Sequence, residues 1–215
     1  MNKIALPLVG ISGLGASSVG GYLLFRNKWN ETPYVKKENT FRNRYSQATL
    51  EEESELWESK FNSFQNGATP THPTLIKAKN QVTTKAQNAK DLHKLGCKEI
   101  YESEIHNSPY FQDFKSYCSR TIKDGMGSTK NWISAGKEDG SKWNPKLTNL
   151  KTHKTEDHHT LDSTLENLKN SLTGTDANWD NEKREALKNW CDGIQKEIFM
   201  GDKSPEFIHA GLYCV

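Results

Sequence analysis

The feature that most constrains this chain is a motif that occurs twice with identical spacing. Residues 108–118 and residues 204–214 both follow the pattern S-P-x-F-x5-Y-C, so five identities fall over eleven positions without a gap. A further cysteine precedes each copy, Cys97 the first and Cys191 the second. Similar elements that recur in the same order along a chain indicate duplication. The chain is therefore expected to contain two tandem, divergent repeats.

The upstream part of each repeat corresponds as well. Residues 57–64 (WESKFNSF) resemble residues 143–150 (WNPKLTNL), because both have Trp first, Lys fourth and apolar residues fifth and eighth. The offset between the copies drifts from 86 to 96 residues, which indicates loops of different length. The expected core of the two repeats consists of Trp57, Trp143, Phe111, Tyr117, Phe207 and Tyr213.

The repeats are expected to be helical. Serine is a good N-cap and proline is tolerated at the first helical position, so each Ser-Pro pair predicts a helix start. Thr49 and Glu52 form a capping-box pattern before another apolar stripe. Sustained alternation with a period of two residues is absent from the sequence, so the predicted fold class is all-α. Helices are expected near residues 49–64, 73–95, 161–172 and 180–191.

The chain begins with an apolar segment that can cross a membrane. Residues 4–25 carry no charge and include 13 hydrophobic residues. As a helix they would rise about 33 Å, enough for a hydrocarbon core of ~30 Å. A transmembrane helix that contacts the lipid bilayer is favoured over a cleaved signal peptide. A buried helix of a soluble domain is disfavoured by five glycines and one proline.

The predicted organisation has five parts. They are an N-terminal transmembrane or signal-anchor segment (1–25), a tether (26–46), helical repeat 1 (47–122), a connector (123–141) and helical repeat 2 (142–215). Basic residues gather after the apolar segment, and strict use of the positive-inside rule places the bulk of the chain in the cytoplasm. An N-terminal lysine before an apolar run is also how exported chains begin, so the charges leave the topology open.

The four cysteines bear on that topology. Repeat symmetry and short loops favour disulfides Cys97–Cys118 and Cys191–Cys214, each worth roughly 3 kcal/mol by loop entropy. Four reduced thiols packed in the core are the alternative. A zinc site made of all four thiolates is disfavoured because no CxxC pair exists. Disulfides would favour an extracytoplasmic domain.

Aromatic-Cys dipeptides recur along the chain, at Tyr117-Cys118, Trp190-Cys191 and Tyr213-Cys214, behind a short, Gly-rich apolar N-terminus. With its lysine- and asparagine-rich composition, the chain resembles the large paralogous families of uncharacterised proteins in hemotropic mycoplasmas. The resemblance covers most of the chain, and its motifs are structural. It implies a membrane-associated or surface-exposed protein that contributes to antigenic variety or host contact, with no established activity and no catalytic residues to transfer.

Sequence motifs typical of catalytic or ligand-binding sites are matched only in part. Gly125–Lys130 superficially resembles a phosphate loop but lacks both the Lys before Ser/Thr and a preceding strand. His158 and His159, with His153, Glu156 and Asp157 nearby, could in principle bind a metal, but they fall in what is expected to be a solvated polar loop. Basic and acidic residues are interspersed and the net charge is +2, which argues against a nucleic-acid partner. No catalytic, cofactor-binding or metal-binding residue and no small-molecule substrate is therefore assigned.

The sequence favours a single-pass membrane protein, most of it extracellular, that acts as an interaction or antigenic module toward a host protein or a second copy. Its expected contact surface is the loops 66–72, 123–141 and 151–160. The alternatives are an exported hydrolase-like enzyme with converging polar residues around His153, Glu156 and His158, a cytoplasm-facing membrane partner, and a form secreted after signal cleavage. Biochemical activity, binding partner and oligomeric state are not specified by the sequence.

Overall fold

A computed structural model describes residues 39–128, 130–174 and 178–215. Within these ranges the secondary structure is helical and contains no strand, which confirms the all-α prediction. The predicted membrane segment 4–25 and most of the tether lie outside the described residues. None of the helices in the described ranges is long and apolar enough to cross a membrane.

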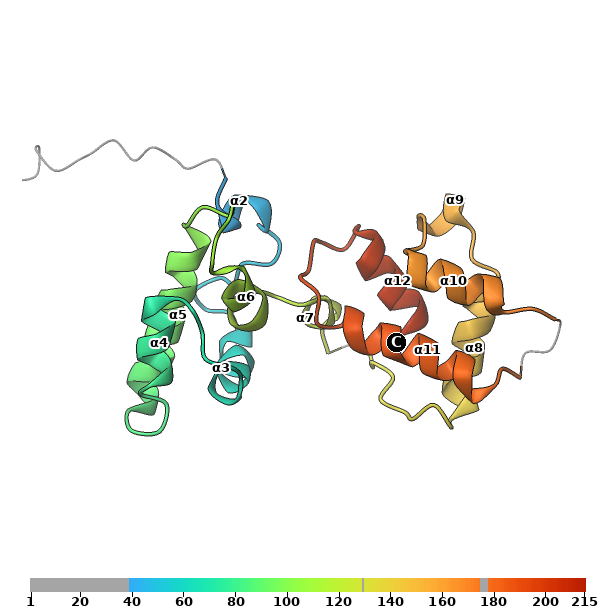
Figure 1. The fold of residues 1–215 in the computed structure, drawn as a ribbon, viewed down its shortest axis with the longest axis horizontal. Coiled ribbons are helices and arrows are strands. Elements are labelled where there is room, and N and C mark those ends of the chain that lie inside the picture. The colour runs from blue at the N-terminus through green and yellow to red at the C-terminus, as the bar shows by residue number, and fades with distance from the viewer. Residues whose placement is uncertain (1–38, 129, 175–177) are drawn as a thin grey trace, which may run out of the picture. The chain divides into compact units, whose positions relative to one another are not determined.

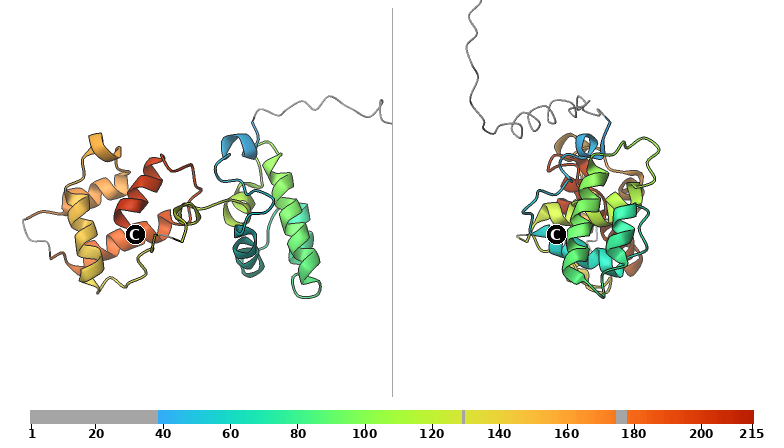
Figure 2. Two further views of the ribbon diagram at one scale, coloured as in Figure 1. Left: turned by 180° about the vertical axis from the view of Figure 1, so that it is seen from behind. Right: turned by 90° about the vertical axis from the view of Figure 1, so that its left-hand side faces the viewer.

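The first repeat contains five α-helices and a π-helix (Figure 1). These are α2 (Phe41–Arg44), α3 (Leu56–Asn66), α4 (Pro73–Lys79), α5 (Ala86–Tyr101), α6 (Phe111–Asp113) and the π-helix η1 (Phe114–Cys118). Helices α4 and α5 lie side by side, as both views in Figure 2 also show. They are joined by turns at residues 80–85, where the sequence predicts one continuous helix over 73–95.

The second repeat follows the same plan. Its helices are α7 (Ile122–Met126), α8 (Gly140–Lys151), α9 (Thr155–His158), α10 (Ser163–Ser171), α11 (Asn181–Ile194) and α12 (Pro205–Tyr213). By position, α3, α4, α5 and η1 correspond to α8, α10, α11 and α12. The helix α9 has no counterpart and lies in the longer loop of the second repeat (Figure 1).

The correspondence extends upstream to the short helices α2 and α7. A threonine caps each of them: the hydroxyl of Thr40 accepts from the Asn43 N–H, and that of Thr121 accepts from the Asp124 N–H, both at 3.2 Å. Each cap residue also forms an isolated antiparallel bridge to the segment after the long cysteine-bearing helix, Thr40 to Glu104 and Thr121 to Ile198. Helix α2 falls in the predicted tether, and α7 runs from the last residue of predicted repeat 1 into the predicted connector; the five predicted boundaries themselves stay predictions.

Each repeat has its own apolar cluster, which contains the corresponding tryptophan, Trp57 or Trp143, and one cysteine pair. Trp57 and Trp143 are 5% and 0% exposed. Their indole N–H groups donate to carbonyls just upstream, of Glu51 at 2.9 Å and of Gly136 at 3.0 Å. Buried indoles need such a partner, so the loops before α3 and α8 are each fixed to the tryptophan of that helix.

The expected core residues do not all lie inside. Tyr117 and Tyr213 are buried and Phe207 is half-buried, but Phe111 is 39% exposed. The prediction for Phe111 is wrong because the first Ser-Pro pair does not start a helix. Ser108 instead accepts from the Tyr110 N–H in a turn, and Phe114 takes the buried position.

The predicted capping box at Thr49 is also wrong. Helix α3 begins only at Leu56, while Thr49 forms an antiparallel bridge to Ser119 at the far end of the repeat. A contact distant in sequence therefore takes the place of the local cap.

Candidate functional site

Both pairs of cysteines form disulfides. Cys97 is bonded to Cys118 with a Cα–Cα distance of 5.2 Å, and Cys191 to Cys214 with 5.6 Å. All four are fully buried, and no cysteine is free. In each repeat the bond joins the longest helix to the end of the last one. The expectation of disulfides is confirmed.

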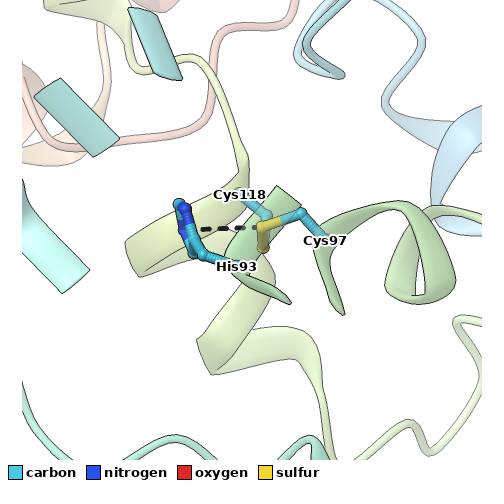
Figure 3. A group of neighbouring side chains, drawn as sticks. All are labelled: His93, Cys97 and Cys118. Atoms are coloured by element: carbon cyan, nitrogen blue, oxygen red, sulfur yellow. Dashed lines mark hydrogen bonds between the residues drawn. A yellow bond between two sulfur atoms is a disulfide. The ribbon is translucent and has the colours of Figure 1, made fainter. Parts of the chain in front are cut away.

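A histidine lies against the first disulfide. His93 precedes Cys97 by four residues on α5, and its Nε2 is 3.7 Å from the Cys97 sulfur (Figure 3). The same nitrogen is 3.1 Å from the Tyr117 carbonyl oxygen, to which it can donate. Burial lowers the pKa of His93 to about 4. The imidazole is therefore neutral at neutral pH.

Three aromatic rings enclose this imidazole. The Phe64 ring stacks on it with centroids 4.7 Å apart, and Trp57 and Phe61 lie at 5.9 and 5.8 Å. His93 itself is 1% exposed. A polar ring in such an environment depends on its one carbonyl partner, since an unpaired buried donor is costly.

The second disulfide has no such neighbour. The residue four positions before Cys191 is Leu187, which is fully buried. The polar groups of this repeat gather instead around Tyr213, whose hydroxyl is 2.7 Å from Nδ1 of His153. The other nitrogen of His153, Nε2, lies 2.8 Å from the His159 carbonyl oxygen. Because Nε2 must donate to that carbonyl, Nδ1 accepts the Tyr213 proton.

Burial perturbs two groups in this polar cluster. It raises the pKa of Tyr213 to about 12. The pKa of His209 is lowered, mainly by burial, although its Nε2 donates to the His158 carbonyl at 2.8 Å. The bond from His209 holds the segment around α9 against α12, and the bond from His153 to the His159 carbonyl closes the loop around α9 on itself.

The tyrosine of each Tyr-Cys pair fixes the loop after the first long helix. The Tyr117 hydroxyl donates to the Ala68 carbonyl at 2.8 Å, two residues beyond α3. Tyr213 bonds to His153, two residues beyond α8. A Cβ on Gly67 would lie 2.6 Å from the Tyr117 hydroxyl, so the close approach in the first loop requires glycine.

A lysine on the next helix supports the same loop in both repeats. Lys79 on α4 donates to the carbonyls of Phe64 and Gly67, each at 2.7 Å. Lys169 on α10 donates to the His153 carbonyl at 3.1 Å. Cations near the end of a helix satisfy carbonyls that have no partner within it.

The candidate polar residues named from the sequence are only partly brought together. His153 is only 6% exposed, so the prediction that it lies in a solvated loop is wrong. The rings of His153 and His158 lie 5.9 Å apart, but Glu156 is exposed on α9. Sequence reasoning missed His93 and His209, and the contrast of His93 with Leu187 in aligned repeats was the available signal for the first.

Comparison of the chain with protein-family models, with curated proteins and with solved structures finds no match in any of the three. Function must therefore be argued from the geometry of the chain itself.

Proposed function

We propose that this chain is a membrane-anchored, outward-facing interaction module in which two disulfide-bonded helical repeats present exposed loops of different length. The anchor is the apolar segment 4–25 expected from the sequence. The partner is a host protein or a second copy, in line with the resemblance to surface-protein families of hemotropic mycoplasmas.

The observation that carries the proposal is the pair of loops between α3 and α4 and between α8 and α10. Both are fixed at the base by a buried tyrosine, yet they differ in length, residues 67–72 against residues 152–162. Fixed scaffolds with divergent loops are a usual arrangement for recognition. These loops are also well exposed, with residues 66–69 and 154–157 on the surface.

The disulfides support the outward orientation. Bonded cysteines persist in oxidising compartments and are rare in the cytosol. The two bonds stabilise small repeats, since closing each loop restricts the unfolded chain.

Protease treatment of intact cells that express the full chain tests the orientation. We expect trypsin to cleave within residues 30–215 without lysis, while a cytoplasmic marker stays intact. Protection of that region until the cells are lysed would contradict the proposal and favour the cytoplasm-facing alternative. Mass mapping of unreduced peptides from the same cells provides a second readout, because reduced thiols in all four cysteines would remove the argument for an oxidising compartment.

Loop variants test recognition. The exposed pair Glu156 and Asp157 on α9 is changed to alanine in the full chain, and binding to host blood cells is compared with the wild type. The matched control changes the exposed Glu182 at the start of α11, outside both loops. We expect binding to fall for the α9 variant alone. Equal binding by all three chains would remove the second loop from the contact surface.

A further inference from the structure

The cluster formed by His93 and the first disulfide contains three ligand atoms of the kind that soft metal ions prefer. His93 Nε2 and the sulfurs of Cys97 and Cys118 all lie within 4.8 Å of one another (Figure 3). All three residues are at most 1% exposed and lie in the centre of the first repeat. We propose that the chain, while its thiols are reduced, binds one Zn²⁺ ion through His93, Cys97 and Cys118.

Two of the three ligands are already at coordination spacing. His93 and Cys97 are four residues apart on α5 and so lie on one face of it, the spacing used by paired ligands on helices. Tetrahedral zinc with Zn–S of about 2.3 Å and Zn–N of about 2.0–2.1 Å places a sulfur and a nitrogen ligand roughly 3.5 Å apart. The distance from His93 Nε2 to the Cys97 sulfur is 3.7 Å. This edge of a zinc tetrahedron therefore exists before any metal binds.

The third ligand must move by a short distance. In the disulfide the sulfurs are bonded, whereas two thiolates on one zinc ion lie roughly 3.8 Å apart. Cys118 is the last residue of η1, and Ser119 after it is extended. The displacement therefore falls at the end of an element, where it breaks no helix interior. To bind the metal, His93 gives up the hydrogen bond that Nε2 donates to the Tyr117 carbonyl, and the ring proton moves to Nδ1.

Charge balance suits the buried position. Two thiolates and a neutral imidazole around Zn²⁺ sum to zero, so no net charge is left in the apolar cluster. Zinc binds imidazole in its neutral form, and the 1% exposure of His93 favours that form. Binding releases the two thiol protons to solvent. Three protein ligands leave the fourth position for a water molecule.

The second repeat provides an internal control. Its cysteines Cys191 and Cys214 occupy the same places, but Leu187 stands where His93 does and offers no ligand atom. Within the described ranges the cluster that holds His93 is the one group of at least three histidine, cysteine or acidic residues with ligand spacing. The proposed site thus belongs to the first repeat alone and to the chain before its cysteines are oxidised.

The test uses the purified full chain in detergent, reduced without oxygen by a phosphine. Each disulfide then gains two hydrogens and the phosphine takes up the oxygen of one water. Co²⁺ is titrated as a spectroscopic probe and then displaced by Zn²⁺. We expect one equivalent to bind with sulfur-to-cobalt charge-transfer absorption, while the oxidised chain shows none.

Two variants separate the site from general thiol binding. His93→Leu, which copies the second repeat, should weaken binding by about 100-fold or more, because one of three ligands is lost. Leu187→His should add a second equivalent with the same spectrum. Equal affinity and spectrum for the wild type and His93→Leu would overturn the proposal, as would binding to the oxidised chain.

Loss of structure on reduction is also informative. If the reduced chain loses helical circular dichroism, Zn²⁺ should restore it in the wild type and not in His93→Leu. Restoration in neither or in both chains would likewise overturn the proposal.

Discussion

The two repeats have a disulfide at corresponding positions, but different side chains pack beside it. In the first, His93 occupies the turn before Cys97 and bonds to a carbonyl, whereas in the second Leu187 occupies that turn before Cys191. The last element also differs, a π-helix in the first repeat and the α-helix α12 in the second, although both come from the same eleven-residue motif. The shared cysteines therefore determine which helices are bonded to each other in a repeat. The residue four positions before the first cysteine determines whether a polar or an apolar side chain packs beside the disulfide.

The tryptophans should show the largest and most symmetrical effects. We expect Trp57→Ala and Trp143→Ala each to lower the free energy of unfolding by about 3–5 kcal/mol, because a buried indole leaves a cavity and an unpaired carbonyl. Phe111→Ala is the control, since that ring is 39% exposed and should cost about 1 kcal/mol or less. Denaturant unfolding measures all three. A large loss at Phe111 would contradict the assignment of that ring to the surface.

The disulfides should be nearly equal in their loop-entropy effect. The sequence separations are 21 and 23 residues, so replacing either pair by alanine should lower the free energy of unfolding by about 3 kcal/mol. Any difference in the free energy of unfolding between the two variants then reports the packing beside each disulfide, where the first repeat has His93 and the second has Leu187. Chemical denaturation of both under oxidising conditions makes the measurement, and a pair that can be removed without loss would break the equivalence of the repeats.

The loss of stability at low pH should depend in part on His93, which has no counterpart beside the second disulfide. The pKa of His93 is about 4 in the folded chain, below its value of ~6.5 in an unfolded chain. The unfolded state then binds the proton first, so stability is full above about pH 6.5 and falls as the pH drops toward 4, by roughly 3 kcal/mol. His93→Leu should lack this part of the acid destabilisation. Thermal unfolding of both chains from pH 7 to pH 4 tests it, and parallel curves would refute it.

The tyrosine hydroxyls should give the smallest effects, and unequal ones. Tyr213→Phe leaves Nδ1 of the buried His153 without a donor and should cost about 1–3 kcal/mol. Tyr117→Phe frees the carbonyl of Ala68, which is exposed and can bind water, and should cost about 1 kcal/mol or less. Hydrogen exchange in the loop around α9 and in residues 67–72 measures the two cases separately. Equal costs would mean that water reaches both bonds.

The duplicated elements could be predicted because they are local patterns. The spacing of Cys97, Cys118, Cys191 and Cys214 within aligned copies predicted the pairing that the structure has. Burial of both tryptophans followed from their place in the repeat.

The errors come from contacts between residues distant in sequence. The helical period of apolar residues continues through Val82, so periodicity did not reveal the turn between α4 and α5. Thr49 has the features of a cap, but Ser119 pairs with it seventy positions later. The burial of His153 depends on Tyr213, sixty positions away. Patterns within a window do not contain such information.

The short stretch after the first disulfide contributes hydrogen bonds to both repeats. The Arg120 N–H donates to the Ala48 carbonyl in the first repeat, and the Arg120 carbonyl accepts from the Phe199 N–H in the second. The backbone of this one residue is therefore hydrogen-bonded to both repeats. Nearest-neighbour coupling of this kind makes adjoining units melt together. A substitution that destabilises one repeat should consequently lower the unfolding temperature of the other, and heating should give a single unfolding transition in place of two.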